Sequence, residues 1–225
     1  MAFPRKMTSA NLEQSRIRRR RVRLLTLAFL LVPSLTGGAE DKHPVTFCAI
    51  DMGSNTFKRI VGSFHEGKYE QRRMVKRTLG VGDDLSRNGR ISEAKLAEIE
   101  ETLSAFKAAC ANEGASQVIA VGTAAFREAP NGERAVEIAS KLGIPMEIAS
   151  EERESELAYL VASLGRDGYA VIDNGSRSIE LASREPGRGF RYSVFNLGYR
   201  VAYERFFAGT KDPRAAVLAF QERLR

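Results

Sequence analysis

Two short segments of the chain share an aspartate, a glycine and small hydroxyl residues in the same order. The first reads AIDMGSNT at residues 49–56, and the second, 122 positions later, reads VIDNGSRS at residues 171–178. Successive backbone N–H groups in such a glycine turn form an anion-binding concavity, and the aspartate can hold Mg²⁺ directly or through water. Two such turns facing each other across a cleft would bind a polyphosphate chain and its metal ion from both sides. Because Asp-x-Gly is also common in hairpins, the alternative is two unrelated turns.

Each motif follows an apolar run that predicts a β-strand, and the two halves of the chain begin alike. In the first half we expect strands at 45–51, 57–63, 69–79, 117–122 and 146–149, helices at 92–112, 133–142 and 151–164, a glycine-rich loop at 80–89 and a loop through Arg127. In the second half we expect strands at 169–173, 179–183 and 190–196, then helices at 199–207 and from 213. The pattern predicts an α/β protein with a complete first lobe at 40–165 and a truncated second lobe at 166–225.

Composition indicates a globular protein without a general nucleic-acid surface. The 225 residues are 43% hydrophobic, which is enough for a packed core. The net charge of +7 comes from the first 39 residues, where eight basic residues face Glu13 alone. From residue 40 onward the chain has 27 basic and 27 acidic residues, so the body of the protein is neutral and general nucleic-acid binding is not expected.

Residues 1–39 have the layout of a secretory signal peptide. A basic segment precedes an apolar stretch at 24–35, and small residues stand at Gly37 and Ala39. We therefore expect an exported, periplasmic protein cleaved after Ala39. The alternative is a membrane anchor that is not cleaved, because the basic segment is long. The pair Arg20-Arg21 is a weak twin-arginine signal, because Arg23 stands where an apolar residue is expected.

Cysteine and histidine usage restricts the chemistry. Cys48 and Cys110 lie in apolar stretches, which favours two small buried thiols over a disulfide, the alternative. The only histidines are His43, beside the expected cleavage site, and His65, in an expected hairpin turn. Neither position suits a Ser-His-Asp triad, a Cys-His pair or a zinc site. Any catalysis is therefore expected to depend on carboxylates.

Four motifs in order resemble the exopolyphosphatase and guanosine pentaphosphate phosphatase family, Ppx/GppA. They are AIDMGSNTF at 49–57, GTAAFREA at 122–129, IASEERE at 148–154, and DNGSRSIEL at 173–181. The resemblance implies two RNase H-like lobes of the actin-like ATPase superfold with a phosphate chain bound between them. It also implies Mg²⁺-assisted hydrolysis of phosphoanhydride bonds in inorganic polyphosphate or a pppGpp-type guanosine nucleotide. A homodimer is a further expectation.

The resemblance assigns roles to individual residues. Glu154, at the start of the helix after the strand end that carries Ser150, would activate the attacking water, and Glu180 would complete the acidic side of the site. Asp51 and Asp173 would hold the metal ion or its water shell. The residues expected to bind phosphate are Gly53, Ser54, Asn55, Thr123, Arg127, Gly175, Ser176, Arg177 and Ser178.

Each assignment has an ordinary structural alternative. Glu154 also belongs to an acidic first helical turn, at 151–156, which the helix dipole favours without any catalytic role. Glu180 could be an outward-facing strand residue beside solvent. Arg127 could be a surface charge, although its planar guanidinium suits phosphate oxygens.

The second motif departs from the family pattern Asp-Ile-Gly-Gly-Gly-Ser-Thr-Glu, because Ser176 and Arg177 replace two glycines. These side chains either obstruct the phosphate loop or, at Arg177, replace backbone donors with a charged one. Gly198 is retained, but Tyr199 and Arg200 replace the small and apolar residues usual after it. Our leading hypothesis is an exported phosphatase. The alternative is a catalytically impaired protein that binds phosphate chains, and an ATP-dependent kinase of the same superfold ranks last.

Overall fold

The computed structural model describes residues 45–65 and 68–223. The predicted leader, its cleavage site after Ala39 and His43 lie outside these residues. Within the described ranges, no helix combines the length and the apolar character needed to cross a membrane.

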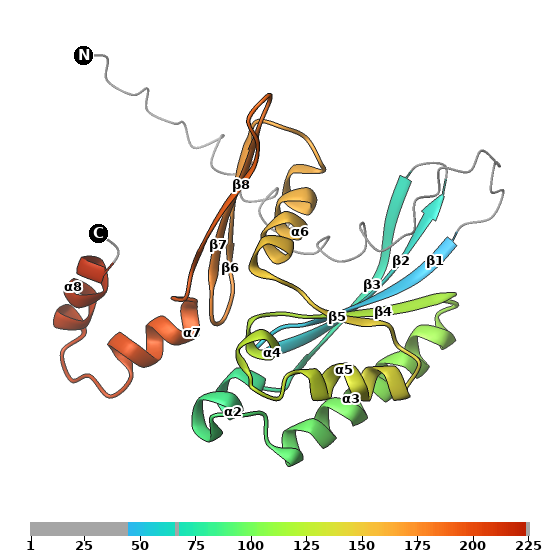
Figure 1. Ribbon diagram of the computed structural model, residues 1–225, viewed down its shortest axis with the longest axis horizontal. Helices are drawn as coiled ribbons and strands as arrows, with labels where there is room; N and C mark the ends of the chain where they lie inside the picture. The colour runs from blue at the N-terminus through green and yellow to red at the C-terminus, as the bar shows by residue number, and fades with distance from the viewer. Residues whose placement is uncertain (1–44, 66–67, 224–225) are drawn as a thin grey trace.

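The first lobe is a five-stranded sheet with helices packed on it (Figure 1). Its strands are β1 (Val45–Met52), β2 (Thr56–His65), β3 (Lys68–Thr78), β4 (Gln117–Gly122) and β5 (Met146–Ile148), in the spatial order β3-β2-β1-β4-β5. β1 pairs antiparallel with β2 and parallel with β4. The helices α3 (Glu93–Asn112) and α5 (Glu133–Lys141) lie on one side of this sheet. β1 therefore ends, with its Asp51, in the centre of the lobe.

The helix predicted at 92–112 is confirmed, and its sequence explains both its start and its buried face. Ser92 is the N-cap, and its hydroxyl accepts a hydrogen bond from the Lys95 backbone N–H at 3.2 Å. Leu96, Ile99 and Leu103, spaced three or four residues apart, are buried against the sheet. This face joins the main core of the lobe, which holds the sheet and its motif loop in place.

Two segments predicted as loops are helices. Residues 80–89 contain α2 (Val81–Asn88), and the expected loop around Arg127 contains α4 (Ala124–Glu128). Gly80 and Gly89 have φ values of 63° and 67°, so the glycines that suggested a loop are the residues that begin and end a short helix. Buried Val81 in α2 and Phe126 in α4 anchor these helices to the core.

The second lobe is built on a three-stranded antiparallel sheet. It contains β6 (Tyr169–Asn174), β7 (Ile179–Glu185) and β8 (Gly189–Phe195), and the helix α6 (Glu151–Ser163) packs against all three strands (Figure 1). The predicted boundary at residue 165 grouped α6 with the first lobe, whereas its packing places it with the second sheet. α7 (Tyr199–Ala202), the π-helical turn η2 (Tyr203–Phe207) and α8 (Pro213–Arg223) follow.

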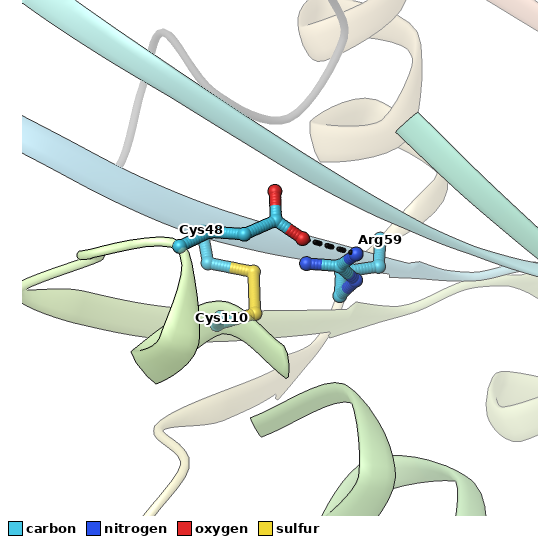
Figure 2. The surroundings of a disulfide bond; sticks show 4 residues. Cys48, Arg59 and Cys110 are labelled. Atoms are coloured by element: carbon cyan, nitrogen blue, oxygen red, sulfur yellow. Dashed lines mark ion pairs between the residues drawn. A yellow bond between two sulfur atoms is a disulfide. The ribbon is translucent and has the colours of Figure 1, made fainter. Parts of the chain in front are cut away.

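A disulfide joins Cys48 and Cys110, so the prediction of two unpaired thiols was wrong. Both residues are fully buried, as predicted, but the last turn of α3 packs over β1 and brings their Cα atoms to 5.9 Å. Linear spacing does not reveal that packing. Arg59 lies beside the disulfide and forms an ion pair with Glu113, at 2.7 Å between Nη2 and Oε1 (Figure 2).

We expect the double variant Cys48→Ala/Cys110→Ala to be less stable than the wild type. A disulfide across 62 residues restricts the unfolded chain, and a loop of that length corresponds to about 4 kcal/mol in the chain-entropy model. Urea denaturation of both proteins, with and without dithiothreitol, measures the free energy of unfolding. Reductant should destabilise the wild type and leave the variant unchanged, and equal midpoints for all four samples would contradict a stabilising disulfide.

Candidate active site

A cleft of about 420 Å³ between the two lobes is lined by both Asp-Gly motifs. β1 and β6 end at this cleft and carry the two motif aspartates to it. The site residues predicted from the sequence that line this cleft are Asp51, Gly53, Ser54, Asn55, Thr123, Glu154, Asp173, Gly175, Ser176, Arg177 and Ser178. The structure therefore brings the two repeats together, and the alternative of two unrelated turns does not describe them.

The two glycine turns have the same local geometry. A Cβ on Gly53 would lie 3.0 Å from the Thr56 carbonyl oxygen, and a Cβ on Gly175 would lie 3.0 Å from the Ser178 carbonyl oxygen. Each contact is with the residue three positions later, at a distance that real Cβ atoms rarely reach. Glycine thus lets the backbone close each turn, and Gly175 N–H donates to Ser178 O at 2.9 Å.

Ser54 connects the first turn to two neighbouring helices. Its Oγ accepts a hydrogen bond from the Ala125 N–H at 3.1 Å, and its carbonyl oxygen accepts one from the Gly82 N–H at 2.7 Å. Ser54 is buried, with 5% of its surface exposed. Its hydroxyl oxygen therefore holds α4 in place, while its hydroxyl proton can still be donated to an anion.

Glu154 lies in the first turn of α6 and points to the cleft. The N-cap Ser150 begins the helix by accepting a hydrogen bond from Arg153 N–H. Arg127 Nη1 donates to Glu154 Oε2 at 3.1 Å and to the Ala149 carbonyl oxygen at 2.7 Å. Arg127, predicted to bind phosphate, is thereby fixed against Glu154 and is not among the residues that line the cleft.

Burial raises the pKa of Glu154 to about 7, and the negative charge of Glu180 contributes to the rise. The charge and hydrogen bond of Arg127 oppose it, and Asp51 adds a smaller increase. A carboxylate with a pKa near neutrality can both accept and release a proton at physiological pH. The solvated-helix alternative does not fit a side chain in this environment.

Glu180, on β7, is buried rather than outward-facing, with 2% of its surface exposed. Burial raises its pKa, a hydrogen bond from Ser178 lowers it, and the charge of Asp173 raises it further. Its Oε1 atom has no hydrogen-bond partner among the described atoms. An unpartnered carboxylate oxygen in this position suits a proton, a bound water or a cation.

The two motif aspartates lie on opposite sides of the cleft. Asp51 Oδ2 accepts a hydrogen bond from Lys58 Nζ at 2.6 Å, within an ion pair. Nowhere in the described part of the chain do three potential metal-ligating side chains cluster closely enough to hold an ion. Mg²⁺, however, is commonly held by one or two carboxylates together with phosphates and waters, and the acidic oxygen donors here fit that requirement.

Sequence reasoning missed two lysines and a tyrosine that line the cleft. Lys58 pairs in register with Asp51 on one side and with Lys76 on the other, so the three side chains project from the same face of the sheet. Tyr199 OH accepts a hydrogen bond from Asn55 Nδ2 at 3.3 Å. The register of a β1–β2–β3 meander would have identified the lysines, since residues opposite one another share a face.

The substituted second motif keeps a regular backbone. Among the described residues, Leu164 is the only non-glycine residue with positive φ, so neither Ser176 nor Arg177 carries left-handed strain. Gly198 is needed here, because a Cβ at this position would lie 2.5 Å from the carbonyl carbons of both residues. Arg177 is one of the residues that line the cleft, and its guanidinium donates to Glu128 of the first lobe.

Comparison with known proteins agrees with this architecture. The family model of the Ppx/GppA phosphatase family matches residues 66–221. A guanosine-5'-triphosphate,3'-diphosphate pyrophosphatase of Vibrio vulnificus is 28% identical over 179 residues, which are 78% of this chain and 35% of that protein. The chain thus spans about a third of the length of this curated relative.

Solved structures show the same fold. A Ppx/GppA family member from Aquifex aeolicus is 25% identical, with a TM-score of 0.68 over 81% of this chain and 61% of that one. An exopolyphosphatase from Cytophaga hutchinsonii has a TM-score of 0.70 at 21% identity, over 80% of this chain and 59% of that one. The predicted α/β class with RNase H-like, actin-like ATPase architecture is confirmed, and the chain belongs to the Ppx/GppA phosphatase family.

Proposed function

We propose that the cleft binds a chain of phosphate groups and that Glu154 acts as the general base for hydrolysis of a phosphoanhydride bond. The observation that carries this proposal is the position of Glu154 at a cleft lined by both Asp-Gly turns, where burial raises its pKa to about 7. A base with this pKa can remove a proton from an attacking water at neutral pH. Arg127 is a positioning residue, because its hydrogen bonds to Glu154 and to the Ala149 carbonyl hold the carboxylate in place.

The remaining cleft residues have roles that follow from their chemistry. Backbone N–H groups of the two turns and the Ser54 hydroxyl would donate to phosphate oxygens. Lys58 would offset substrate charge at the first turn. Asp51 and Asp173 would hold Mg²⁺, which supplies charge neutralisation on the phosphoryl oxygens when bound. Glu180 would keep that side of the cleft anionic and so favour cation binding.

Inorganic polyphosphate and pppGpp-type nucleotides are the proposed substrates. The relative from Vibrio vulnificus has a guanosine polyphosphate in its name, and the structure from Cytophaga hutchinsonii is an exopolyphosphatase. Both substrate types end in a phosphoanhydride. A cleft with Lys58 and Lys76 on one wall suits either polyanion.

A second candidate function is phosphate-chain binding without efficient hydrolysis. It is favoured by the ion pair between Asp51 and Lys58 and by the contact of Arg177 with Glu128 instead of an open loop. The two candidates predict different effects of removing Glu154.

We also propose that the protein is exported. The basic and apolar leader supports export, as does the disulfide between Cys48 and Cys110, because disulfides persist in oxidising compartments such as the periplasm. Mass spectrometry of the intact protein tests this proposal. A mass equal to that of residues 40–225 would fit cleavage after Ala39, and a mass that includes residues 1–39 would favour the uncleaved anchor.

Glu154→Gln should abolish the base while keeping the size of the side chain. We expect Mg²⁺-dependent phosphate release from polyphosphate to fall by about 100-fold or more. Glu152→Gln is the matched control, because Glu152 lies in the same acidic helical turn but is exposed, and it should retain wild-type activity. If wild type and Glu154→Gln release phosphate equally slowly while both retain the polymer, the binding function replaces the enzymatic one.

The pH dependence of kcat/KM tests the same assignment. Because the base acts in its deprotonated form, activity should rise with pH through an inflection near pH 7, the pKa of Glu154. Arg127 lowers this pKa, so Arg127→Gln should move the inflection to higher pH, whereas Arg127→Lys, which retains the charge, should move it less. An inflection that is unchanged in Arg127→Gln would show that another group titrates.

A further inference from the structure

Two arginines of the second lobe form ion pairs with acidic residues of the first lobe. Arg177 donates to Glu128 Oε2 through Nε at 2.8 Å and through Nη2 at 2.5 Å. Arg200 Nη2 donates to Asp83 Oδ2 at 2.6 Å. Both arginines occupy positions where the sequence departs from the family pattern.

The two pairs differ in their relation to the cleft. Arg177 lines the cleft within the second Asp-Gly motif, whereas Arg200 is absent from the cleft lining. Arg177 Nη1 also donates to Ser86 Oγ at 3.0 Å and to the Gly82 carbonyl oxygen at 3.3 Å. All three nitrogens of its guanidinium therefore contact the first lobe. The only anionic group among these contacts is the Glu128 carboxylate.

The Glu128 carboxylate binds Arg177 in the way that a substrate phosphate would. Both groups present anionic oxygens that accept charge-assisted hydrogen bonds from a guanidinium. The Glu128 side chain is 37% exposed and the Arg177 side chain is 19% exposed, so solvent reaches the ion pair from the Glu128 side and a polyanion can compete with the carboxylate there.

We propose that Arg177 is a phosphate-binding residue and that Glu128 occupies its guanidinium in the absence of ligand, as an internal competitor of the phosphate chain. The inference rests on the proposed phosphate-chain cleft but not on hydrolysis. A bound phosphate chain replaces the Glu128 carboxylate on Arg177. Because the ligand must compete with a carboxylate, the site favours ligands with high negative charge. In the second motif, Arg177 then supplies a charged donor in place of the backbone donors of a glycine loop.

The proposal is tested by calorimetric titration with tripolyphosphate in EDTA, where Mg²⁺-dependent turnover does not interfere. Glu128→Gln should bind tripolyphosphate about three- to five-fold more tightly, because it removes the competitor ion pair. Arg177→Gln should weaken binding. In the Arg177→Gln background, Glu128→Gln should not increase the affinity for tripolyphosphate, because the guanidinium for which Glu128 competes is gone.

Asp83→Asn is the matched control. It removes the ion pair between Arg200 and Asp83 and changes the net charge by the same amount as Glu128→Gln, but Arg200 does not line the cleft. Its affinity for tripolyphosphate should stay close to that of the wild type. Equal tightening in both variants, no tightening in Glu128→Gln, a gain that survives loss of Arg177, or no binding by any variant would overturn the proposal. Loss of phosphate release with the binding pattern intact would overturn only the hydrolytic function.

Discussion

The burial of two electrostatically coupled acidic side chains, Glu154 at the cleft and Glu180 behind it, is the constraint on which the rest of the site depends. Burial raises the pKa of both Glu154 and Glu180, and the negative charge of Glu180 raises that of Glu154 further. Placing carboxylates close together in a desolvated position is unfavourable, and Arg127 offsets only part of the cost. The folded core of each lobe must therefore hold them there. A cation or a protonated state relieves this repulsion, so the electrostatics of the two carboxylates favour the species that the proposed hydrolysis of a phosphate chain would need.

The repeated glycine turn explains how two different sheets present matching loops to one cleft. Gly53 and Gly175 make the same close approach to a carbonyl three residues later, which lets each turn close, and Ser54 and Gly198 connect the turns to distant residues. The strands before them differ in packing, since β1 lies between β2 and β4 whereas β6 pairs with β7 at the edge of its described sheet. Local sequence allows the turn, and the strand before it carries the turn to the cleft.

Periodicity and capping predicted most elements, because those signals are local. The helix begun by Ser92 and the strands of both sheets follow directly from them. The short helix α2 was missed because Gly80 and Gly89 end a helix as readily as they form a loop. The disulfide and the burial of Glu180 were hidden for another reason, since both depend on which helix covers which strand. For the same reason, the resemblance located Glu154 whereas the residues alone favoured a solvated helical turn.

Arg177, Tyr199 and Arg200, which depart from the family pattern, share one structural role. Each side chain contacts the first lobe, at Glu128, Asn55 and Asp83 respectively. Gly198 remains necessary between them, because the backbone of the second turn lies against it. Loss of two glycines therefore did not distort the turn but replaced backbone donors with side chains that bridge the lobes. Since these bridges are partly exposed ion pairs and one hydrogen bond, the proposed displacement of Glu128 by a polyanion would break contacts that solvent already weakens.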